Sequence, residues 1–294
     1  MDSLKTIAEL VRFELVQAIV QRRLLGIFAL YSLVIAALCW SWIAFNDYIR
    51  EEWRSQNIGD SSLTSDMLLV MVKEQLFERF VGYIGGETPG GVAAIYTSEP
   101  IALVIMVGFT LLLPSLVLIT TFDHGLANLQ NRVFHFYTLR VTRTEWFIAH
   151  FLSALCLTVV PTIVGGLALV FVNISQFGGI GALSVDAVTR LTLVGFALIL
   201  YTQGWIFLTK HFAKTSMMAL ILAVSCSICL TVAPWLSEQW PLLAPVDWLA
   251  KSRWVDGLWS ENYAVFIQSV GSIVALSFIP ICASFILWKR RSLV

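Results

Sequence analysis

The stretch "FIAHFLSALCLTVVPTIVGGLALVFV", residues 147–172, contains no Asp, Glu, Lys or Arg over its 26 residues. About 20 apolar residues cross the hydrocarbon core of a bilayer as an α-helix. A helix also bonds its own backbone groups, which a segment surrounded by lipid must do. This stretch therefore predicts a transmembrane helix, and it decides the fold class: an integral membrane protein.

The rest of the chain has the same character. Of its 294 residues, 58% are hydrophobic and only 13% are charged, whereas a soluble domain carries about 25% charged residues. We therefore expect one all-α transmembrane domain over residues 1–294, with no separate soluble domain. Its six spans are predicted at residues 24–45, 101–122, 147–172, 188–208, 216–236 and 263–288.

Lys and Arg in the connecting segments indicate which way the spans run. Of the 19 basic residues, 12 lie on the side that holds both termini and the segment 123–146, and 7 lie on the other side. Of the 19 acids, only 5 lie on the first side. Basic residues favour the cytoplasmic side, so both termini are expected to be cytoplasmic.

Residues 3–23 have the pattern of an amphipathic helix. The apolar side chains recur at helical spacing, with Lys5 and Glu9 off their stripe. Such a helix is expected to lie in the cytoplasmic membrane interface and to turn into the first span at Arg22 and Arg23. It would serve either as a simple anchor or as a working part of the protein. The stripe consists of Leu4, Ile7, Ala8, Val11, Leu15, Ala18 and Ile19.

Two long loops are predicted on the outer side. Residues 46–100 contain a predicted helix at 69–83 and carry nine acids against four bases. This loop would attract a cationic cargo or a metal ion, or it is simply a solvated loop; it is also the place where a periplasmic partner could bind. Residues 235–262 carry five tryptophans, which favour the lipid–water boundary, so a short interfacial helix is expected there.

The chain lacks the sequence motifs of most enzymes. It contains no HExxH, no GxSxG and no GxxxxGK[ST] loop for ATP phosphates. Cys226 and Cys229 form a CxxC without a further ligand nearby, so small apolar side chains are expected rather than a metal site. Asp186 and Arg190, one turn apart, are expected to pair. We expect no catalytic residue, metal or cofactor in this chain, and energy for uphill transport would come from another polypeptide.

The cytoplasmic segment 123–146 differs from the other short connections. It links two predicted spans directly and mixes large apolar side chains with Arg132, Arg140 and Arg143. Exposed aromatic residues beside Arg are typical of protein–protein hot spots. The segment is thus predicted to bind a cytoplasmic partner, with an ordinary positive-inside loop as the alternative.

The sequence "RVTRTEWFIAHFL", residues 140–152, carries a resemblance to a known family. Together with the six predicted spans, the N-terminal amphipathic helix and the outer 235–262 loop, it resembles the type-2 permease subunits of ATP-binding-cassette transporters. These are the exporter-like class that includes the nitrous-oxide-reductase maturation permeases. Arg143 falls on the family's Arg, Thr142 on its small polar residue and Glu145 on its acidic or amide position. Arg140 and His150 stand where the family pattern has Pro and Lys.

The resemblance implies partners and roles. Two copies of the chain, or one copy and a homologous permease, would form the pore in a bacterial inner membrane, and a separate ATPase subunit would bind ATP and Mg. The segment 123–146 would be the coupling segment. Its contacts with the ATPase would come from Asp123, Arg132, Phe136, Tyr137, Arg140, Arg143 and Glu145. The interface helix would brace them through Arg12, Glu14, Arg22 and Arg23.

The predicted cargo follows from the apolar spans. An amphipathic, lipid-like or peptide cargo suits this lining better than a bare ion, which needs oxygen ligands or charge in its path. The zero net charge gives no indication of nucleic acid. One alternative is a mechanotransmission subunit that moves a periplasmic partner through residues 46–100; another is a stand-alone carrier or enzyme. The candidate path residues are Thr158, Thr162, Thr202, Gln203, Ser225 and Gln268.

Overall fold

The computed structural model describes residues 2–20, 108–109, 112–122, 141–177, 185–213, 215–240 and 262–290, with scattered residues at 26–44 and 249–260. No β-strand occurs among these residues, so the predicted all-α class is confirmed. The helices are α1 (Asp2–Val20), α6 (Leu113–Thr121), α9 (Arg143–Phe177), α10 (Val185–Lys210), α11 (Ser216–Gln239) and α14 (Tyr263–Arg290).

Three of the described helices are long and apolar enough to cross a membrane. Their apolar stretches are Arg143–Ala168 in α9, Val188–Lys210 in α10 and Tyr263–Arg290 in α14, at the positions of three predicted spans. The apolar stretch of α11, Ser216–Leu230, is shorter. The structure therefore supports a membrane protein, while the total of six spans stays a prediction.

The helix α9 continues past Pro161 in its interior. Proline has no N–H, so a carbonyl one turn earlier loses its usual partner. Hydroxyls beside this position bond within the helix: Thr158 donates to Leu155 O at 2.9 Å and Thr162 to Thr158 O at 2.7 Å. These acceptors differ from the Leu157 carbonyl that Pro161 leaves without its usual partner, so the bonds pair the two threonine hydroxyls within the helix.

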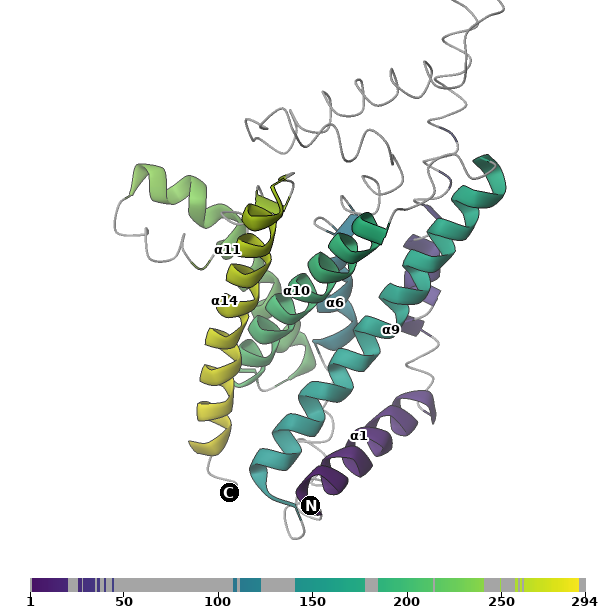
Figure 1. Ribbon diagram of the computed structural model, residues 1–294. Helices are drawn as coiled ribbons and strands as arrows, with labels where there is room; N and C mark the ends of the chain where they lie inside the picture. The colour runs from purple at the N-terminus through teal and green to yellow at the C-terminus, as the bar shows by residue number, and fades with distance from the viewer. Residues whose placement is uncertain are drawn as a thin grey trace, which may run out of the picture.

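The helix α10 lies at the centre of the described part. It contacts α14, α6, α11 and α9, while α1 runs along α9 near the first turns of that helix (Figure 1). Val194, Ala197 and Leu198 of α10 have no exposed area and form part of the main core cluster. The core is therefore built around one central helix, which other helices surround.

Gly204 allows α14 to approach α10 closely. A Cβ at this position would lie 3.0 Å from both Pro280 Cγ and Ser277 O of α14. That spacing is tighter than ordinary van der Waals contact, so a larger residue would push the two helices apart. This glycine is required by packing between the helices.

Arg190 joins the start of α10 to the start of α14. Its Nε donates to Asp186 Oδ2 at 2.9 Å, which confirms the predicted pair. Its Nη1 donates to Ser260 O at 2.8 Å, and its guanidinium lies over the rings of Tyr263 and Phe266. The buried charge is thus shared among a carboxylate, a carbonyl and two aromatic faces.

Candidate functional site

The helix α9 starts with a capping box within the last residues of the predicted coupling segment 123–146. Thr142 N donates to Glu145 Oε2 at 2.9 Å, and Glu145 N donates to Thr142 Oγ1 at 3.3 Å. Such a reciprocal pair satisfies backbone donors that a helix start leaves unpaired. The cap starts α9 at Arg143, four residues before the predicted span, and gives the end of the coupling segment a fixed direction.

The start of α9 is also fastened to the end of α14. Arg143 Nη1 donates to Lys289 O at 2.9 Å, and Trp288 Nε1 donates to Arg143 O at 3.1 Å. The Trp288 ring stacks on Trp146 with centroids 4.5 Å apart. The donor from Arg143 is favourable because Lys289 lies in the last turn of α14, where carbonyls lack partners within their own helix.

The helix α1 reaches the same place through a buried carboxylate. Glu14 is 7% exposed and His150 of α9 is 5% exposed. His150 Nδ1 lies 3.0 Å from Glu14 Oε2, and the Ser153 hydroxyl also donates to Glu14 Oε2. Both α9 side chains thus contact one carboxylate. In a catalytic triad the histidine stands between serine and acid, so this arrangement fastens α1 to α9 rather than activating a nucleophile.

The helix α10 completes the surroundings of His150. The His150 ring stacks on Trp146 at 4.9 Å and lies 5.3 Å from the Phe207 ring. Lys210 is 8% exposed and places Nζ 4.5 Å from the Phe207 ring centroid. We call Glu14, Arg143, Trp146, His150, Ser153 and Trp288 the junction, where α1, α9 and α14 meet.

The structure describes only some of the residues predicted for the coupling segment and the interface helix. Arg143 and Glu145 make the internal contacts given above, Glu14 is turned toward α9, and Arg12 is exposed. Their predicted contacts with an ATPase stay predictions. The other residues of this set lie outside the described part of the chain: Asp123, Arg132, Phe136, Tyr137, Arg140, Arg22 and Arg23.

The six predicted path residues do not gather at one place. Thr158, Thr162 and Gln203 are buried among the helices, whereas Ser225 and Gln268 are exposed. The hydroxyls of Thr158 and Thr162 are bonded to carbonyls of α9 itself. Of the six, Thr202 lines the groove between α6, α10 and α11.

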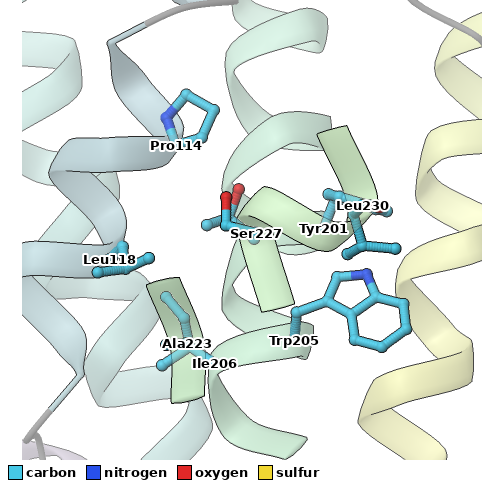
Figure 2. A pocket seen from close by; sticks show the side chains of 9 residues that line it. Pro114, Leu118, Tyr201, Trp205, Ile206, Ala223, Ser227 and Leu230 are labelled. Atoms are coloured by element: carbon cyan, nitrogen blue, oxygen red, sulfur yellow. The ribbon is translucent and has the colours of Figure 1, made fainter. Parts of the chain in front are cut away.

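That groove lies between α6, α10 and α11 (Figure 2). It holds about 420 Å³ of empty space, counting its open side, and Trp205 and Tyr201 stand in its wall. The Tyr201 hydroxyl donates to Leu249 O at 2.7 Å. The remaining lining is mostly carbon and suits an apolar group. It consists of Pro114, Leu118, Thr202, Ile206, Ala223, Ser227 and Leu230.

Comparisons with known proteins add no assignment. The chain matches no protein-family model and no curated protein. Among the described residues, no group of three or more His, Cys, Asp or Glu side chains is placed to hold a metal ion. The junction and the groove are therefore interpreted from their own geometry.

Sequence reasoning missed most of the junction. The capping box has a sequence signal, since Thr142 and Glu145 have the [ST]-x-x-E spacing. The contact of Glu14 with His150 joins residues 136 positions apart, and that of Trp288 with Arg143 joins residues 145 apart. No local pattern of a single sequence indicates such pairs, so only the fold could reveal them.

Proposed function

We propose that this chain is the membrane-spanning permease subunit of an ATP-binding-cassette transporter. A separate ATPase subunit would hydrolyse ATP, and the permease would turn that work into export of an amphipathic, lipid-like or peptide cargo. Two copies, or one copy and a homologous permease, would form the pore. The proposal joins the resemblance at residues 140–152 to the geometry of the junction.

The junction is the observation that supports the proposal best. A coupling segment must pass a push from its partner to several helices at once, and rigid, packed elements with fixed contacts can carry such a push. Residues 123–140 lead directly into the capped start of α9, which is fastened to α14 by Trp288 and Arg143 and to α1 by Glu14.

The mechanism follows from these attachments. Closure of two ATPase subunits would move their bound coupling segments toward each other. Because α9 is fastened to α1 and α14, the three helices would tilt as a group relative to α6 and α11. The groove between α6, α10 and α11 would change shape in that motion, and Thr202 in its wall would be exposed to cargo.

Charge reversal in the coupling segment tests the proposal. Arg132→Glu with Arg140→Glu should reduce capture of an ATP-binding-cassette ATPase by detergent-solubilised chain at least tenfold, because Arg contacts at an interface centre carry much of its affinity. Neither residue belongs to the junction. Lys251→Glu with Arg253→Glu makes the same charge change on the opposite predicted side and should leave capture unchanged. Equal capture by both double variants contradicts the coupling assignment.

A further inference from the structure

One buried carboxylate lies in the contact between α1 and α9. Glu14 and Ala18 on one side of α1 are buried, whereas Phe13 and Val16, which helical spacing points away from that side, are 45% and 48% exposed. Among the side chains that the structure describes, Glu14 is the one buried acid. A carboxylate in such a place is costly unless it is bonded, so its position on the neighbouring helix matters.

Apolar burial alone does not fix how far α1 is shifted along α9, because hydrophobic contact is non-directional. A shift by one turn moves α1 by four residues, or about 6 Å along its axis. Leu10 or Ala18 would then replace Glu14 opposite His150, and either side chain suits an apolar contact. The aliphatic face of α1 therefore permits more than one alignment.

The bonds to Glu14 distinguish these alignments. His150 Nδ1 lies 3.0 and 3.1 Å from the two carboxylate oxygens, and the Ser153 hydroxyl donates to one of them. Each hydrogen bond to a charged group favours the bonded state by about tenfold or more. Two such bonds favour the observed alignment by roughly 100-fold over one that removes the carboxylate.

We propose that Glu14 sets the register of α1 on α9, as a positioning residue for the N-terminal helix. A single buried polar residue is a known means of choosing one alignment among several similar apolar ones. The register decides where the exposed Lys5 and Arg12 lie relative to the coupling segment. That last consequence rests on the proposed function, whereas the register itself does not.

Distances between spin labels on α1 and α9 test the proposal in the purified full chain, without an ATPase. Labels at positions 4 and 152 replace exposed side chains, since Leu4 is 76% and Leu152 is 40% exposed. The otherwise unchanged chain should give one narrow distance. Glu14→Leu should give two or more distances, displaced by at most about 6 Å for each turn of shift. Glu9→Leu, which removes an exposed acid of the same helix, should keep the single distance.

The proposal is overturned by a single unchanged distance in Glu14→Leu, by equal splitting in Glu9→Leu, or by a broad distance distribution from a detached α1. The last would mean that Glu14 holds the helix without choosing its register. The double variant Glu14→His with His150→Glu keeps the pair with its partners swapped, so it should give one distance even if Glu14→Leu folds poorly. More than one distance in this double variant also counts against the proposal. If Glu14→Leu splits the distance as expected but the unchanged chain captures no ATPase, the register proposal stands and the proposed function is refuted.

Discussion

Replacing the buried Gln203 of α10 with an apolar residue is expected to stabilise the protein, whereas most substitutions destabilise. Its side chain has no exposed area, and neither Nε2 nor Oε1 has a hydrogen-bond partner in the described part of the chain. An unpaired buried polar group costs about 1–3 kcal/mol. Two such groups place the cost at about 2 kcal/mol or more. Gln203→Leu removes both groups and keeps a similar size, so it should stabilise the protein by about 2 kcal/mol.

Reversible unfolding in mixed micelles, followed by circular dichroism, measures this change. A gain of about 2 kcal/mol lowers the unfolding equilibrium constant by about 30-fold. Gln268→Leu is the matched control because the Gln268 side chain on α14 is exposed, and it should change stability by less than about 0.5 kcal/mol. Destabilisation by Gln203→Leu of about 1 kcal/mol would show that the amide is paired, which would refute the reasoning.

Three further changes test the packing, the junction and the cap. Gly204→Val should destabilise by about 1–3 kcal/mol in the same unfolding measurement, because a Cβ added there would lie 3.0 Å from Pro280 Cγ; unchanged stability would contradict the close approach of α10 and α14. Trp288→Phe keeps a stacking ring but loses the N–H donor to Arg143 O of α9, so the hydrogen-exchange rate of the amides at residues 141–146 should rise about fivefold. An unchanged exchange rate would refute the role of this hydrogen bond in the junction. Thr142→Ala should cost about 1 kcal/mol, and Thr144→Ala in the same turn should be near neutral.

Local patterns in the sequence predict local structure well. The apolar run at 147–172 predicts α9, and the spacing of Asp186 and Arg190 predicts the ion pair at 2.9 Å. Both features depend on residues close together in the chain, where helical geometry alone decides the contact. The helix α9 begins at Arg143, four residues before the predicted span, because polarity indicates where the lipid-embedded part begins whereas the capping box indicates where the helix begins.

Long-range contacts of the junction do not follow from such patterns. The resemblance implies that Glu14 helps to brace an ATPase, and this role stays a prediction. The fold places its side chain against His150 and Ser153 of α9, a contact that the sequence did not indicate. The apolar stripe predicted for α1 includes Leu4, which is 76% exposed. Which face of an amphipathic helix is buried depends on the neighbouring helix, and the sequence of α1 does not specify that neighbour.

The path residues illustrate a second limit. Hydroxyl residues in apolar spans suggest a polar path, but in a lipid environment they equally bond to their own backbone. Thr158 and Thr162 do so beside Pro161. Of the six path residues, Thr202 lines the groove between α6, α10 and α11. Amino-acid type alone therefore does not separate a path residue from one that supports its own helix.

The most direct measurement is a photo-cross-link from the predicted coupling segment in intact membranes. A benzoylphenylalanine at position 137 should attach the chain to an ATP-binding-cassette ATPase, and the same group at position 240, on the opposite predicted side, should not. ATP hydrolysis by the captured complex should fall once the cross-link forms, since the segment would then be held in place. Cross-links from position 137 to lipid alone, with no ATPase attached in the working assembly, would contradict the account.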